Sequence, residues 1–291
     1  MTTVGAIALP YQPLERYLPI ARAADEAGLA ELWLWEDCFA SGGLGAAAAL
    51  LGATEHLRVG IGVLPVPLRN VAVTAMEIAT LERLFPGRLV IGLGHGVQDW
   101  MGQVGARPRS VLTLFREYVT ALRSLLDGEE VTVAGDYVHL DRVRLAWPPE
   151  RRVPIHAGVT GEKSLRLAGE VADGTILVGG TSRAGLRRAR GLIDEGRPTD
   201  RPEPHHIVQY LPAATGPDAV ERMARDRSHW NDTSEEETVA VGDAAAVAAV
   251  VTRFAGAGAD TVVLQPTLDD PDPEGFVRFV AAEVAPLVRA G

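Results

Sequence analysis

The strongest constraint on the fold of this chain is a regular alternation of short aliphatic runs with longer segments of helical periodicity. In the longer segments apolar residues recur every three or four positions, as at Thr74, Ile78, Leu81 and Phe85, which is typical of helices with one buried face. The short runs have the length and composition of buried strands. They cover residues 5–9, 31–35, 58–66, 88–94, 153–159, 174–178, 206–211 and 261–265.

Eight strands that alternate with helices predict a parallel sheet, because each crossover needs a helix to return the chain beside its starting strand. The count and the length of 291 residues favour an α/β fold that closes into a single (β/α)8 TIM barrel over residues 1–291. A doubly wound open sheet is the alternative, because periodicity does not separate the two. Two polar stretches, 127–149 and 228–240, are interpreted as inserts after strand 4 and between strands 7 and 8.

The predicted helices carry capping residues at their ends. Asn70, Ser110 and Asp243 precede helical segments as candidate N-caps, and Pro86-Gly87 follows one.

Composition limits the classes of partner. A formal net charge of -10 disfavours nucleic acid, and the single cysteine, Cys38, excludes an internal disulfide. The sequence shows no targeting segment and no apolar run that could span a membrane, so we expect a cytoplasmic protein that acts on small molecules. The histidines are scattered or adjacent rather than spaced as metal ligands, so we expect no metal.

In a TIM barrel the C-terminal ends of the strands build the active site. The second strand ends in Trp35-Glu36-Asp37-Cys38, which places two carboxylates and a thiol there. A partly buried carboxylic acid at this position would serve as a general acid or base, and the alternative is that both acids cap the following turn. Cys38 is either a nucleophile or a small buried hydrophobe.

The fourth strand ends in alternating glycines, Gly92, Gly94 and Gly96, with His95 between the last two. Glycines at these positions let another body approach the backbone, and a flat ring is one candidate. The third glycine falls one position early for a dinucleotide fingerprint. His95 would donate to a ring oxygen or to substrate, or else bond a neighbouring carbonyl.

The fifth strand leads through Thr160-Gly161 into a helix that begins with Glu162, Lys163 and Ser164. Free N–H groups and the positive end of the helix dipole favour an anion here, and Lys163, the only lysine, adds positive charge. This pattern predicts a phosphate site. The alternative is an ordinary helix start capped by Thr160.

Between residues 57 and 180 the sequence resembles the luciferase-like flavin-dependent oxidoreductases of the bacterial luciferase-like superfamily, in particular the coenzyme F420-dependent branch. The matching residues are Arg58-Val59-Gly60-Ile61-Gly62-Val63-Leu64-Pro65, Leu68-Arg69-Asn70, Pro86-Gly87-Arg88, Gly92-Leu93-Gly94-His95-Gly96, His156-Ala157-Gly158 and Leu167-Ala168-Gly169-Glu170.

The resemblance implies a non-proline cis peptide at Gly62-Val63, forming a bulge that presses on one face of the cofactor ring. It implies F420 as cofactor, with FMN as the alternative, and a homodimer. Carried over by position, it predicts two groups of contacts: Glu36, Gly62, Val63, Pro65, His95 and Gly96 for the ring and its neighbourhood, and Thr160, Gly161, Lys163 and Ser164 for the phosphate.

The implied activity is hydride transfer between a deazaflavin and a small organic substrate, with Asp37 or His95 handling the proton. Sugar-phosphate dehydrogenases of this branch carry a histidine at the position of Asp37 and a glutamate at that of Val97, so their chemistry does not transfer. Trp35 and Trp100 are candidate substrate contacts, with plain packing as the alternative.

Three other functions stay open at this level. An FMN-dependent two-component monooxygenase would react reduced flavin with oxygen. The absence of the family acid at Val97 allows a non-catalytic flavin-binding protein. A phosphate turn alone would also suit a non-redox barrel enzyme that acts on a phosphorylated metabolite.

Overall fold

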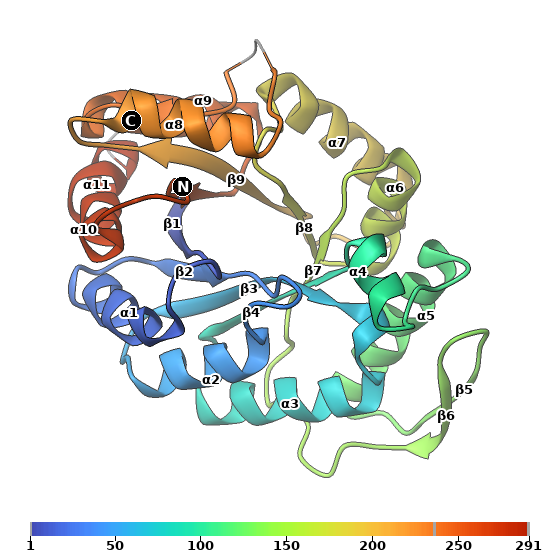
Figure 1. Ribbon diagram of the computed structural model, residues 1–291. Coiled ribbons are helices and arrows are strands. Elements are labelled where there is room, and N and C mark those ends of the chain that lie inside the picture. Colours follow the sequence, from blue (N-terminus) through green and yellow to red (C-terminus); the bar gives the residue numbers. More distant parts are fainter. Residues whose placement is uncertain (1, 235–236, 290–291) are drawn as a thin grey trace.

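The chain forms a closed barrel of parallel strands surrounded by helices (Figure 1). The computed structural model describes residues 2–234 and 237–289. Strand β1 (Thr3–Ala8) pairs in parallel with β2 (Glu31–Leu34) and with β11 (Thr261–Gln265), the last strand. Strand β8 (Gly174–Leu177) pairs with β9 (His206–Ala214), which completes the ring. The predicted TIM barrel is confirmed, and the open-sheet alternative is wrong.

All eight predicted runs are barrel strands, with ends that shift by a few residues at most. The remaining six are β2 (Glu31–Leu34), β3 (Arg58–Pro65), β4 (Leu89–Gly94), β7 (Ile155–Gly158), β8 (Gly174–Leu177) and β9 (His206–Ala214).

The helices cover the outside of the barrel with their apolar faces inward. The three candidate N-caps are confirmed, because the side chains of Asn70, Ser110 and Asp243 accept hydrogen bonds from the first turns of their helices. The helices are α1 (Tyr17–Glu26), α2 (Gly43–Gly52), α3 (Val71–Leu84), α4 (Gln98–Gln103), α5 (Val111–Leu126), α6 (Glu162–Val171), α7 (Arg183–Gly196), α8 (Ala219–His229), α9 (Ala244–Ala257), α10 (Pro273–Phe279) and α11 (Ala285–Arg289), with short turns at Leu14–Arg16, Val66–Leu68 and Val280–Val284.

The inside of the barrel has its own small core, separate from the layer between strands and helices. Trp33 is fully buried there, packs edge-on against Tyr210, and donates from its indole nitrogen to Glu31. A Cβ at Gly60 would lie 2.4 Å from the Trp33 ring, so the glycine makes room for the indole. This core separates a smaller cavity of about 330 Å³ at the N-terminal ends of the strands from the mouth at their C-terminal ends, where TIM barrels place their active sites.

The two interpreted inserts have different structures. Within 127–149 the chain forms an antiparallel hairpin of β5 (Val131–Ala134) and β6 (His139–Val143), whose turn is held by three backbone N–H donors to Glu117. The second stretch begins in the last turn of α8 and ends at the start of β10 (Ala240–Val241), which pairs with β9. Residues 235 and 236 of that stretch lie outside the described residues. Among the described residues, no helix is long and apolar enough to cross a bilayer.

Candidate active site

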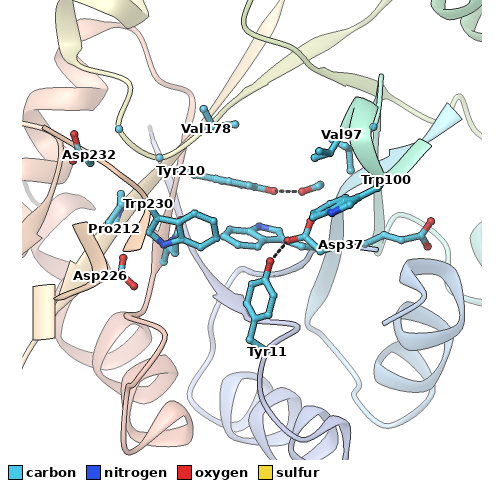
Figure 2. A pocket seen from close by; sticks show the side chains of 18 of the residues that line it. Tyr11, Asp37, Val97, Trp100, Val178, Tyr210, Pro212, Asp226, Trp230 and Asp232 are labelled. Atoms are coloured by element: carbon cyan, nitrogen blue, oxygen red, sulfur yellow. Dashed lines mark hydrogen bonds between the residues drawn. The ribbon is translucent and has the colours of Figure 1, made fainter. Parts of the chain in front are cut away.

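A cavity of about 610 Å³ opens at the C-terminal mouth of the barrel (Figure 2). Its walls come from the ends of β2, β3, β4, β8, β9 and β11, and from the segment that follows α8. Its size is that of a typical cofactor or substrate site. Of the predicted site residues, eight line it: Trp35, Glu36, Asp37, Gly62, Val63, Pro65, Gly96 and Trp100.

One wall of the cavity is a backbone bulge at the end of β3. The Gly62-Val63 peptide is cis, which confirms the prediction from resemblance. The pairing register of β3 with β4 shifts between Ile61 and Leu64, so Val63 leaves the ladder, and it lines the cavity. The chain thus presents a residue of the barrel wall to whatever occupies the mouth.

Two of the alternating glycines, Gly92 and Gly94, make room for this bulge, together with Gly158 on β7. A Cβ at Gly94 would lie 2.5 Å from a Val63 methyl, and one at Gly158 would lie 2.4 Å from the other methyl. A Cβ at Gly92 would lie 3.2 Å from Val63 and 2.5 Å from Ile176. At Gly92 and Gly94 the body that approaches the backbone is therefore a protein side chain and not a flat ring. Gly96 lies against Met101 and lines the cavity, and its contact with a ring stays a prediction.

Glu36 is a buried carboxylate whose two oxygens are occupied by protein donors. Arg69 donates from Nη2 at 2.5 Å and from Nε at 3.2 Å, and the backbone N–H of Gly43 donates at 2.6 Å. These bonds tie the end of β2 to the start of α2 and to the turn before α3. The side chain lines the cavity, and its contact with a cofactor stays a prediction.

Asp37 faces the centre of the cavity and accepts a hydrogen bond from the Tyr11 hydroxyl at 2.6 Å (Figure 2). Burial raises the pKa of the Asp37 carboxyl, while the Tyr11 bond opposes that shift. The pKa of Tyr11 is itself raised, first by burial and then by Asp37. A carboxyl and a hydroxyl paired in this way have the chemistry of a proton-handling group, and the catalytic role of Asp37 stays a prediction. Sequence reasoning missed Tyr11, although it follows the C-terminal end of β1.

Cys38 does not have the surroundings of a nucleophile. Burial raises the pKa of its thiol, and the neighbouring Glu36 and Asp37 raise it further. A reactive thiol needs the opposite shift. The Cys38-Phe39 peptide is cis, a feature that the sequence did not predict.

His95 links the mouth to helix α6. Its Nε2 lies 3.1 Å from the Ser164 hydroxyl, so the ring bonds a side chain rather than a neighbouring carbonyl. The ring packs edge-on against Phe115, and burial lowers its pKa, which keeps it neutral near pH 7. His95 does not line the cavity, although Gly96 does. Its predicted part in proton transfer remains untested.

The start of α6 is open to solvent and carries no side-chain cap. Gly161 is the N-cap residue, and Thr160, Gly161 and Lys163 are exposed. The alternative in which Thr160 caps this helix is therefore wrong. The uncapped N–H groups, together with the Lys163 ammonium, have the chemistry of an anion site.

Aromatic side chains enclose the outer part of the cavity. Trp35 stacks on Tyr210 with 6.2 Å between ring centroids, and Trp230 packs edge-on against Trp35 at 6.3 Å. Trp230 also lies 6.4 Å from Tyr11, and Trp100 faces them across the cavity (Figure 2). Trp230 was missed because it stands in a polar stretch interpreted only as an insert. A single large aromatic residue in an otherwise polar stretch was the feature that could have indicated a site residue there.

Two further acids line the cavity near Trp230. Asp226 is buried, accepts from the Leu268 N–H at 3.0 Å, and has a pKa raised by burial. Asp232 accepts from Arg227 Nε at 3.0 Å. Within residues 2–234 and 237–289, no group of three potential metal ligands gathers.

The fold and this cavity define a TIM-barrel protein with a cofactor-sized site at the strand C-termini, backed by a cis bulge. The family model described as luciferase-like monooxygenase matches residues 1–261, and the chain belongs to this family.

Two relatives and one solved structure illustrate what this chain is similar to. A 5,10-methylenetetrahydromethanopterin reductase of Methanolobus tindarius is 31% identical over 60% of this chain and 53% of its own length. An F420-dependent glucose-6-phosphate dehydrogenase of Nakamurella multipartita is 30% identical over 49% of this chain and 47% of its own length. The chain thus spans about half the length of these relatives. An F420-dependent secondary alcohol dehydrogenase in complex with an F420-acetone adduct superposes with a TM-score of 0.86 at 22% identity, covering 99% of both chains.

Proposed function

We propose that this protein is an F420-dependent oxidoreductase that transfers a hydride between the deazaflavin and a small organic substrate. The observation that carries the proposal is the cavity backed by the Gly62-Val63 bulge. The F420-dependent enzymes among its relatives support the choice of cofactor.

The residues present fit such a cofactor in two respects. The cavity of about 610 Å³ is walled by apolar groups on the side of Val63, as a flat ring requires. Next to it, His95 bonds Ser164 in the first turn of α6, so the mouth leads to the uncapped helix start. We propose that Val63 and Pro65 hold the ring, and that Gly161, Lys163 and Ser164 hold the phosphate.

When bound, the deazaflavin would supply C5 as the hydride donor or acceptor. The chain's own residues have three tasks. Asp37 holds the proton that accompanies the hydride, since it is the carboxyl that faces the centre of the cavity, with Tyr11 as its one donor among the described residues. Tyr11 orients that carboxyl. Trp35, Trp100 and Trp230 exclude water from the reacting atoms.

Separate titrations of the purified chain with F420 and with FMN test this proposal. We expect F420 to bind at least ten-fold tighter than FMN, and a Lys163→Ala variant to lose about ten-fold of that affinity, since it removes one cation from the phosphate site. Arg109→Ala is a control that removes a cation elsewhere on the surface. Tighter binding of FMN together with oxygen consumption would contradict the proposal in favour of a monooxygenase, and F420 binding without turnover of any substrate would favour a carrier.

We further propose a homodimer in the cytoplasm. Helix α3 exposes Val73, Met76 and Leu84, which are 51%, 59% and 65% accessible, along its outer face. Apolar side chains exposed in this number on one helix favour a partner surface. Sedimentation velocity tests the dimer, and a monomer at micromolar concentration would contradict it. A chain with Cys38 as its single thiol needs no oxidising compartment.

A further inference from the structure

The outer half of the cavity combines aromatic faces with carboxylates. We propose that it binds a planar substrate that carries a cationic nitrogen, and that it rejects anions. The inference rests on the proposed function, because the bound molecule is taken to be the hydride partner of the cofactor.

The aromatic part consists of rings from four separate segments. Tyr11 and Trp230 lie 6.4 Å apart, and they keep 50% and 41% of their surfaces accessible although they line a cavity. Trp35 packs edge-on against Trp230 at 6.3 Å between ring centroids. Trp100 lies on the far side of the cavity from Trp230 (Figure 2). Ring faces open to a cavity attract flat apolar molecules and, through their negative π-faces, cations.

The charges of the lining have one predominant sign. Four carboxylates belong to it, and Arg227 is the one basic side chain among the described lining residues. Glu36 is neutralised by Arg69 from behind the wall, and Asp232 holds Arg227 at 3.0 Å. Asp37 and Asp226 have no basic partner in a described salt bridge. The lining therefore offers no free cation to an anionic substrate.

These two features act on the same molecule. A cation over Trp230 or Tyr11 gains from the ring faces and from the field of Asp37 and Asp226, whereas a neutral ring of the same shape gains only apolar contact. An anion of the same shape loses through repulsion by both carboxylates. We therefore expect charge, rather than shape alone, to rank ligands of one size.

Three bicyclic probes of similar shape test this ranking: 1-methylquinolinium, quinoline and quinoline-2-carboxylate. Calorimetric titrations at pH 8 of the full chain saturated with F420 should show the cation at least ten-fold tighter than quinoline, and the carboxylate weaker than quinoline. The cation should leave the affinity for F420 unchanged. Equal affinities for cation and neutral probe, or competition of the cation with F420, would overturn the inference.

Two variants assign the effect to the residues. Trp230→Leu should weaken the cation about ten-fold and quinoline much less, while Trp147→Leu, which removes a 73% exposed indole outside the cavity, is the matched control. Asp232→Asn removes the carboxylate that neutralises Arg227, which keeps its bond to the Ser234 carbonyl, and should improve binding of the carboxylate probe. Thermal melts confirm that each variant folds, and no change in either folded variant would overturn the inference.

The probe titrations are repeated without F420, so that the two proposals fail separately. Failure of F420 to bind, with the cation still preferred, would contradict only the proposed function. Tight F420 binding with no preference for the cation would contradict only the substrate class.

Discussion

At the scale of single residues, the chemistry of the site depends on Asp37 and its surroundings. The end of β2 brings the carboxyl into the cavity, and Tyr11 reaches it from the end of β1 at 2.6 Å. The sequence was sufficient to predict Asp37, because an acid at a strand C-terminus is a local signal. Tyr11 and Trp230 could not be assigned in the same way, since their roles arise from contacts with segments far away in the chain.

Tyr11→Phe tests the pair. The tyrosine bond favours ionised Asp37, so its loss raises the pKa of that carboxyl further. In the pH profile of kcat/KM, we expect the limb that reports ionisation of Asp37 to move to higher pH by about one pH unit. The direction is the same whether Asp37 acts as acid or as base. Profiles of both proteins over pH 4–9 measure the shift.

Asp37→Asn should reduce kcat by about 100-fold with little change in KM, because it removes the proton-transfer group and keeps the shape. Asp99→Asn, on the exposed helix α4, is the control. An unmoved limb in Tyr11→Phe, or full activity in Asp37→Asn, would rule out this role.

At the scale of elements, the strands were predictable and the bulge was predictable only through resemblance. Aliphatic runs report burial, so all eight barrel strands could be read locally. Val63 leaves the ladder because Gly92, Gly94 and Gly158, on two other strands, make room for it. That packing is a property of three strands together. Hairpin β5–β6 was missed because its strands are only four and five residues long and β6 is interrupted by charged residues.

The opposite end of the barrel contains buried histidines that make an element-scale prediction. Burial lowers the pKa of His205 to about 4 and that of His156 to about 3, from 6.5. Between those values the folded state binds fewer protons than the unfolded chain, so stability falls as pH decreases below 6.5 and levels off below the folded pKa. We expect about 2 kcal/mol of loss per histidine between pH 6.5 and 5.

Urea unfolding at pH 7 and pH 5 checks this prediction with His205→Gln, which retains a polar group for the Thr175 hydroxyl and removes the titration. The variant should lose less stability on acidification than the parent. His56→Gln, whose side chain is 88% accessible, is the matched control. An identical pH dependence in parent and His205→Gln would show that His205 does not contribute.

At the scale of the whole molecule, closure of the barrel brings residues that are far apart in the sequence together at one mouth. Strand β1 pairs with β11, so residues from the two ends of the chain share the wall that the cofactor and substrate are proposed to use. The sequence predicted the barrel and much of its mouth, because the C-terminal ends of all strands converge there. It could not predict the aromatic cover, which depends on how the segment after α8 folds back over the mouth.

The central claim is that the Val63 bulge and the start of α6 together seat a deazaflavin. A crystal structure of the full chain with F420 tests it most directly. The account predicts the ring against Val63, with the cofactor phosphate within hydrogen-bond distance of the N–H groups of residues 162–164 and near the Lys163 ammonium. A ring bound elsewhere, or a mouth filled by the chain's own side chains, would contradict it.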